Sequence, residues 1–167
     1  RYGAGWGLAG VSQWRWTSSN YAPQGGLVIV DGDGMTGFWR HVATAGAVST
    51  FAAPPGDASA VTYDASTGLL TRRFPDGTVV RLSDAGGNTL SVTDRLGSAT
   101  TFGYDAAGRL ATVTDPANRV LRLAYRGSGP GEVAAGGYQP GSLGLIEDPG
   151  GRQTWVGVDG SGDLRRV

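Results

Sequence analysis

Several residue types that build sites in other proteins are missing or scarce in this chain of 167 residues. It has no cysteine, which excludes disulfide frameworks, thiolate nucleophiles and zinc-thiolate sites. No apolar run approaches the roughly 20 residues that cross a bilayer, so we predict no membrane span. Histidine occurs once, and any general-base chemistry would have to pass through His41.

An excess of charge of one sign is missing as well. All 14 basic residues are arginine, 14 acids match them, and the formal net charge is zero. Because no basic field exists to attract phosphate backbones, we expect no nucleic-acid partner. The first residues have neither an initiating methionine nor a signal-peptide pattern, and the last have the pattern of a strand interior. We expect the chain to be a segment of a longer polypeptide.

Glycine is the residue in excess, with 30 copies beside 8 prolines. The 40% hydrophobic share argues against disorder, and the lack of a strict period of three excludes collagen. Apolar stretches are short, rich in β-branched and aromatic residues, and interrupted every few residues by Gly, Asp or Pro. We predict an all-β chain with strands at Val11–Trp16, Leu27–Val30, Gly37–His41, Val61–Tyr63, Leu69–Phe74, Thr78–Leu82, Thr89–Thr93, Ser98–Tyr104, Leu110–Thr114, Val120–Tyr125, Leu145–Glu147, Thr154–Val158 and Leu164–Val167.

Internal repeats organise these strands. Tyrosine, or leucine in its place, recurs after 19, 22 and 21 residues at Tyr63, Leu82, Tyr104 and Tyr125. One such repeat has the length of two strands and two turns, which is a hairpin. A single hairpin is marginally stable, so we predict stacked antiparallel hairpins of about 21-residue period that form a curved, extended sheet.

A second spacing locates an insertion. Asp94 and Asp115 are 21 residues apart, whereas the next copy, Asp148, follows 33 residues later. The extra residues fall in the segment 127–142, whose six glycines and two prolines predict a loop. We divide the chain into a pre-repeat β segment at 1–60, hairpin repeats at 61–126, the Gly/Pro-rich insertion loop at 127–142 and a further, truncated repeat at 143–167.

The turn residues have definite physical roles. An Asp side chain can accept hydrogen bonds from turn amides, and Gly takes a positive φ without steric cost. Asn118 stands in a glycine position, and Asn is the non-glycine residue best suited to the left-handed conformation. The residues assigned to the repeat motif are Tyr63, Asp64, Gly68, Asp84, Gly87, Asp94, Gly97, Tyr104, Asp105, Gly108, Asp115, Asn118, Tyr125, Asp148, Gly151, Asp159 and Gly162.

These motifs resemble a known family. YDASTGLL, DAGGNTLSVTDRLG, YDAAGRLATVTDPAN and IEDPGGRQTWVGVDGSGDL are similar to copies of the RHS repeat, also called the YD repeat. The segments GAGWGLAGVSQW, LVIVDGDGMTGFWR and APPGD resemble the region that precedes such repeats. Leu82 and Val158 in the tyrosine position, Asn118 and the insertion depart from the family pattern.

The resemblance implies a structural role. Long RHS-repeat proteins are secreted or lie at the cell surface, and their hairpins spiral into a hollow shell that encloses a carboxy-terminal toxin in bacteria or serves adhesion in animals. It therefore implies a non-enzymatic scaffold whose partners are further repeats of a longer parent chain and an enclosed effector. An alternative is a surface module that binds glycans, adheres, or assembles with other copies of itself through open sheet edges.

Other chemistry has weaker support. Asp31 and Asp33 in DGDG suggest a calcium loop, but Met35 and Val42 occupy ligand positions of that motif, and a tight turn is the better interpretation. His41 has no nucleophile-elbow motif with it, so we expect neither catalysis nor a cofactor. Sugar stacking and core packing both explain the tryptophans Trp6, Trp14, Trp16, Trp39 and Trp155, and we favour the core.

The repeat arginines are interpreted as members of cross-strand ion pairs on a solvated sheet face, because they alternate with aspartates. They are Arg72, Arg73, Arg81, Arg109, Arg119, Arg122, Arg165 and Arg166.

Overall fold

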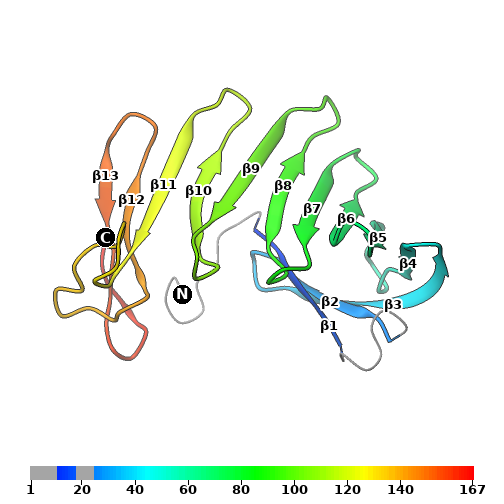
Figure 1. Ribbon diagram of the computed structural model, residues 1–167, viewed down its shortest axis with the longest axis horizontal. Coiled ribbons are helices and arrows are strands. Elements are labelled where there is room, and N and C mark those ends of the chain that lie inside the picture. Colours follow the sequence, from blue (N-terminus) through cyan, green and yellow to red (C-terminus); the bar gives the residue numbers. More distant parts are fainter. Residues whose placement is uncertain (1–10, 18–24) are drawn as a thin grey trace. The chain divides into compact units, whose positions relative to one another are not determined.

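The computed structural model describes residues 11–17 and 25–167, and every regular element within them is a β-strand. Thirteen strands form an antiparallel sheet of stacked hairpins whose order, β1 to β13, is the order of the sequence, and β14 and β15 form a separate pair (Figure 1). The predicted all-β fold of stacked hairpins is confirmed. The described residues contain no helix, and so none that is long and apolar enough to span a membrane.

The chain divides into two compact units. The amino-terminal unit comprises the described residues through Thr100, and the carboxy-terminal unit comprises Thr101–Val167. The strands before this boundary are β1 (Gln13–Trp16), β2 (Leu27–Val30), β3 (Thr36–Ala45), β4 (Val48–Ala52), β5 (Ala60–Asp64), β6 (Leu69–Arg73), β7 (Val79–Ser83) and β8 (Thr89–Thr93). The boundary falls within β9 (Ala99–Tyr104), which precedes β10 (Leu110–Thr114), β11 (Val120–Tyr125), β12 (Leu143–Glu147), β13 (Gln153–Trp155), β14 (Gly157–Val158) and β15 (Leu164–Arg166).

Strand β3 connects the pre-repeat strands to the hairpin repeats. Its first half pairs with β2 from Thr36 to Trp39, and its second half pairs with β4 from Arg40 to Ala45. In Figure 1 this long strand curves from β2 round to β4. The predicted strand ended at His41, and β4 was not predicted at all, because its small residues give a weak apolar pattern.

The core of the amino-terminal unit lies between β1–β3 and the inward face of the hairpins. Two cross-strand rows point into it, one running Phe51–Val61–Arg72–Val80–Val92 and the other Ser49–Tyr63–Leu70–Leu82–Thr89. Trp14, Leu27, Ile29 and Trp39 from β1–β3 pack against these rows and are almost completely buried. The rings of Trp14 and Trp16 meet edge to face, 4.9 Å between centroids. The pre-repeat segment therefore covers the apolar face of the first hairpins.

The edge of β1 is bonded to the turn before β8. The amide of Trp14 donates to the carbonyl of Gly87 at 2.9 Å, and the indole nitrogen of Trp14 donates to the carbonyl of Ser83 at 2.8 Å. The hydroxyl of the fully buried Thr89 accepts from the amide of Ser12 and donates to its carbonyl. One edge of β1 pairs with β2, and these bonds join its other edge to the repeats.

Gly87 is needed for this close approach. Its φ is +68°, and a Cβ atom there would overlap the carbonyl oxygen of Trp14. Gly97 has a similar φ of +88° with open space around it. We predict that Gly97→Ala costs about 1–2 kcal/mol through backbone strain alone. Gly87→Ala costs about 1–3 kcal/mol more, because buried polar groups of β1 lose their partners.

Urea unfolding followed by tryptophan fluorescence measures both losses, since Trp14, Trp16 and Trp39 lie in the amino-terminal unit. Equal losses of unfolding free energy for Gly87→Ala and Gly97→Ala would show that the contact between β1 and the Gly87 turn does not stabilise the fold.

Candidate functional site: repeat turns and arginine clamps

One turn geometry recurs seven times in the described residues. The amide of its first residue donates to the carbonyl of the fifth at 2.8–3.0 Å, and the amide of the fourth donates to the carbonyl of the first at 2.8–3.1 Å. The fourth residue has φ between +60° and +91°, as a type I turn followed by a left-handed residue requires. The fourth residues are Gly34, Gly77, Gly97, Gly108, Asn118, Gly151 and Gly162.

Aspartate closes five of these turns with its side chain. Its Oδ1 atom accepts from the amides of the third and fifth residues at 2.8–3.0 Å, at Asp94, Asp105, Asp115, Asp148 and Asp159. In the last four turns Oδ2 also accepts from an arginine Nε at 2.5–2.7 Å. These arginines, Arg109, Arg119, Arg152 and Arg165, pair with the aspartate of their own turn and not with a neighbouring strand. For Arg109, Arg119 and Arg165, the predicted cross-strand pairing is wrong.

Hydrogen bonds lower the pKa of four turn aspartates, Asp105, Asp115, Asp148 and Asp159. The Arg119 amide, followed by its side chain, lowers the pKa of Asp115, and Arg152 acts on the pKa of Asp148 in the same way. At Asp159 the side chain of Arg165 has the largest effect and lowers the pKa. Burial would raise the pKa of Asp105, but the hydrogen bonds from Arg109 outweigh burial and lower it.

The remaining motif residues lie in other local structures. Tyr63 on β5 donates its hydroxyl to the Asp84 carboxylate at 3.0 Å, and Gly68 closes the turn that starts at Asp64. The ring of the buried Tyr125 lies 4.5 Å below the guanidinium of Arg109, and its hydroxyl donates to the carbonyl of Leu110 at 2.7 Å. Tyr104 ends β9 directly before the Asp105 turn. Tyr63 and Tyr125 thus link their strands to other parts of the hairpin stack.

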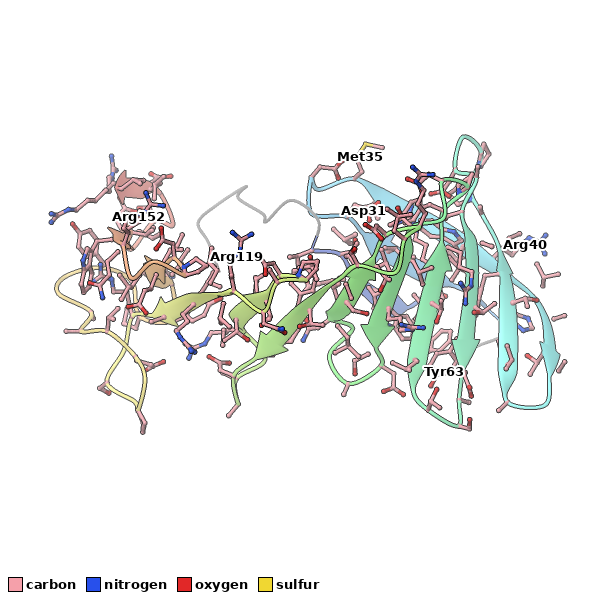
Figure 2. All side chains as sticks on the ribbon, turned by 90° about the horizontal axis from the view of Figure 1, so that it is seen from above. Asp31, Met35, Arg40, Tyr63, Arg119 and Arg152 are labelled. Atoms are coloured by element: carbon pink, nitrogen blue, oxygen red, sulfur yellow. The ribbon has the colours of Figure 1, made fainter. Side chains whose placement is uncertain are left out.

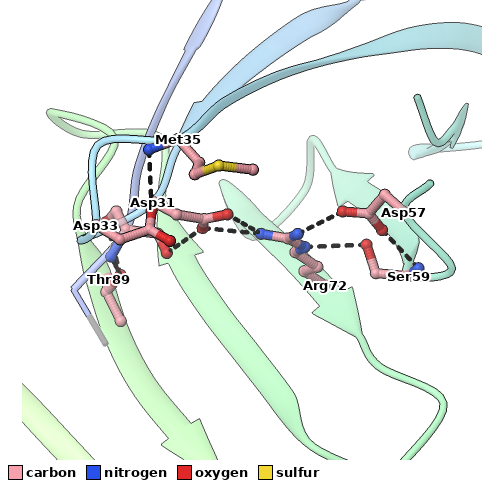
Figure 3. A network of polar contacts seen from close by, with 8 residues as sticks. Asp31, Asp33, Met35, Asp57, Ser59, Arg72 and Thr89 are labelled. Atoms are coloured by element: carbon pink, nitrogen blue, oxygen red, sulfur yellow. Dashed lines mark hydrogen bonds and ion pairs between the residues drawn. The ribbon is translucent and has the colours of Figure 1, made fainter. Parts of the chain in front are cut away.

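Arg72 forms the first of two arginine clamps. It stands in the inward apolar row, with 6% of its side chain exposed, and faces Asp31 at 2.9 Å and Asp57 at 2.6 Å (Figure 3). Its Nε donates to Ser59 at 2.9 Å, and its guanidinium lies over the rings of Trp39 and Phe74. The expectation that Arg72 lies on a solvated face is wrong, because period two places it on the same face as Leu70.

This clamp ties the pre-repeat loops to the repeats. Asp31 follows β2 and also accepts from the hydroxyl of Ser12, while Asp57 precedes β5. Burial would raise the pKa of Asp57, but hydrogen bonds from Ser59 and the charge of Arg72 outweigh it, and the pKa is lowered. Arg72 therefore holds β6 to the loops that carry Asp31 and Asp57, and these two carboxylates compensate its buried charge.

Arg126 forms the second clamp, inside the carboxy-terminal unit. It is 7% exposed, donates to the carbonyls of Ala134 and Val156 at 2.8 and 2.7 Å, and lies over the ring of Tyr138. The insertion is held further by Glu132, which pairs with Arg109 at 2.9 Å. The 127–142 segment has no strand of its own, but it is anchored at both its middle and its end.

Among the residues that the structure describes, no metal-binding cluster of His, Asp or Glu is assembled. The Asp31 carboxylate binds Ser12 and Arg72, while Asp33 accepts from the Met35 amide at 2.9 Å. His41 contacts Thr44 through Nε2 at 2.9 Å, and no nucleophile-base-acid arrangement surrounds it among the described residues.

The tryptophans divide between core and surface. Trp14 and Trp39 lie in the core, Trp16 is partly buried against it, and Trp155 is 44% exposed. Trp6 lies outside the described residues.

Comparison with known proteins agrees with the turn geometry. The model of the RHS repeat family matches residues 84–120, which span β8, β9, β10 and their turns. Residues 84–120 are therefore an RHS repeat. No curated protein matches it at a significant level.

Two sets of contacts were not predicted from the sequence. Asp57, Ser59 and Arg72 are brought together from loops and a strand that no short motif connects. Arg126 and Glu132 were overlooked because the insertion was interpreted as a plain loop. A usable signal existed only for Arg72, whose alternation with Leu70 and Phe74 places it on the inward face.

The lowered pKa values of the turn aspartates predict an acid-sensitive fold. A group whose pKa is lowered in the folded state contributes stability above its ordinary value of 3.8, and the contribution disappears as the pH falls through the lowered pKa. We expect the free energy of unfolding to be nearly constant between about pH 7 and 5 and to fall below roughly pH 4. Urea unfolding across this range measures it; a loss centred near pH 6 would contradict the assignment.

The Arg72 clamp is predicted to carry much of the stability of the amino-terminal unit. Arg72→Met leaves Asp31 and Asp57 without their cation and costs about 3 kcal/mol. Arg119→Met is the matched control, because its ion pair with Asp115 is exposed to solvent and contributes little to stability. Urea unfolding compares them, and losses of equal size would refute a special role for Arg72.

Proposed function

We propose that this chain is a wall segment of a longer secreted or cell-surface protein, in which the hairpin stack encloses or presents an effector carried by the same polypeptide. The coarser statement, that the chain is a structural repeat scaffold, follows from its RHS repeat and its stacked hairpins. The secreted or cell-surface location and the enclosed effector are what we propose beyond that statement.

The repeated turn is the observation that carries the proposal. Each copy satisfies its own amides and its own aspartate, so a hairpin can be added to the sheet without any new partner for the turn. Such a design suits a sheet that grows to any length. The aspartate of each such turn is already engaged in hydrogen bonds with turn amides, which supports a role without catalysis.

Assembly of separate copies through sheet edges has less support. The β1 edge is bonded to Gly87 and faces Asn88 in an antiparallel bridge. Strand β13 is three residues long and follows the charged, highly exposed Arg152, and short charged edges resist pairing with other chains. A continuous polypeptide is therefore the favoured context for the stack.

Limited proteolysis of the whole reading frame that contains this chain tests the proposal. We expect the segment that follows the repeats to resist protease while the sheet is folded and to be cut once urea unfolds it. Arg72→Met should shift this loss of protection to lower urea, and Arg119→Met should leave it nearly unchanged.

Two results would contradict the proposal. One is cleavage of the following segment at the same rate with and without the folded repeats. The other is a reading frame that encodes no further segment.

A further inference from the structure

The outward face of the pre-repeat strands carries apolar side chains. Cross-strand pairing aligns Arg15, Val28 and Phe38, one residue from each of β1, β2 and β3. Their neighbours along the strands, Trp14 and Trp39 among them, lie in the core, so this row points away from it. Phe38 is 45% exposed. The hairpins cover the inward side of these strands, and the outward side is left to solvent.

Phe38 and the two valines of β2 form one apolar patch. Phe38 pairs directly with Val28, and Val30, two residues further along β2, is 37% exposed. A Cβ atom at Gly26 would lie 2.8 Å from the ring of Phe38, so this ring packs over bare backbone just before β2. Apolar side chains that are exposed as a group, unlike scattered single ones, are typical of interaction sites.

Arginines flank this patch on two sides. Arg15 lies roughly 10 Å from Phe38 across two strand spacings, and Arg40 follows Phe38 by two residues, roughly 7 Å along β3. Both arginines are exposed, and in Figure 2 the side chain of Arg40 extends away from β3. Among the residues that the structure describes, neither forms an ion pair, and Arg40 only reaches the carbonyl of His41, at 3.4 Å. The patch is therefore apolar at its centre and positively charged at both ends.

The two acids of the segment that carries these strands are engaged elsewhere. Asp31 follows Val30, but its carboxylate lies on the inward side, where it binds Arg72 at 2.9 Å. Asp33 lies in the turn between β2 and β3 and accepts from the amide of Met35 at 2.9 Å. A guanidinium group binds a carboxylate through two parallel hydrogen bonds. A partner that brings its own carboxylates to the two ends of the patch is therefore complementary to it in charge.

We propose that this β1–β3 surface, defined by Arg15, Val28, Val30, Phe38 and Arg40, docks an acidic amphipathic segment of another protein. Phe38 and the two valines bury the apolar side chains of that segment, and the arginines pair with carboxylates that flank them. Aromatic and arginine side chains contribute most of the binding energy in many protein interfaces. The docking role goes beyond that of the hairpins as a wall, because the surface lies on the strands that precede them.

Other occupants of the β1–β3 surface fit less well. A second copy of the chain would meet the same face in a symmetric dimer, which brings arginines of like charge together. An anionic membrane takes up apolar side chains from an amphipathic helix, whereas these lie on the flat of a sheet.

Selection from a random peptide library displayed on phage, with this chain as the bait, tests the proposal. We expect the enriched peptides to share large apolar residues flanked by Asp or Glu. Their consensus peptide, followed by fluorescence anisotropy, should bind about tenfold or more weakly to Phe38→Ser and to Arg15→Gln/Arg40→Gln. Only the arginine variant should reduce the salt dependence of binding, because only it removes ion pairs.

Two matched controls change similar side chains elsewhere. Leu96→Ser replaces an apolar side chain that is 79% exposed in a repeat turn, and Arg119→Gln/Arg152→Gln removes two exposed charges. Both should bind the consensus peptide as the unchanged chain does, and urea unfolding checks that every variant is folded.

The proposal is overturned if no peptide is enriched, or if the consensus peptide binds Phe38→Ser and Arg15→Gln/Arg40→Gln as tightly as the unchanged chain. Two further results would assign the surface to another occupant and overturn it as well. One is binding of phosphatidylserine vesicles, but not of phosphatidylcholine vesicles, that Phe38→Ser abolishes. The other is a dimer in sedimentation velocity that Phe38→Ser dissociates.

Discussion

A stacked hairpin exposes two faces, and its alternating side chains make one of them apolar, so the stability of the stack depends on what covers that face. In the amino-terminal unit the cover is the pre-repeat segment. Strand β3 leaves its pairing with β2 and continues into pairing with β4, which brings Trp14, Leu27, Ile29 and Trp39 onto the rows that Leu70 and Leu82 belong to. The pre-repeat segment and the first repeats thus form one folded unit.

The buried arginine follows from the same constraint. Arg72 stands at an inward position where its neighbours are apolar, and a cation there requires opposite charge nearby. Asp31 and Asp57 supply it from loops on both sides of the hairpin, and Trp39 and Phe74 flank its guanidinium. Because the acids of this unit are used in loops and turns, the outward arginines Arg40, Arg73 and Arg81 remain available to solvent. The positions of these acids thus account both for the compensated Arg72 on the inward face and for the exposed arginines on the outward face.

The alternation of side chains and the turn residues predicted the hairpins from the sequence. Contacts between residues distant in sequence could not be predicted in this way. Strands β8, β10 and β11 begin and end where period two and the flanking Asp and Gly residues place them, because each turn is satisfied within five residues. Val48–Ala52 was missed because small residues weaken the pattern, although its neighbours β3 and β5 impose the strand. The roles of Arg72, Arg126 and Glu132 depend on partners 8 to 41 residues away, and spacing alone carries no such signal.

Amide hydrogen exchange tests most directly whether the pre-repeat strands and the repeats are one unit. If β1–β3 cover the hairpins as an integral layer, the amides of Trp14, Ile29 and Trp39 exchange as slowly as those of Leu70 and Leu82, and Arg72→Met accelerates all of them together. Exchange of β1–β3 that is much faster than that of β5–β7, and unaffected by Arg72→Met, would contradict this account.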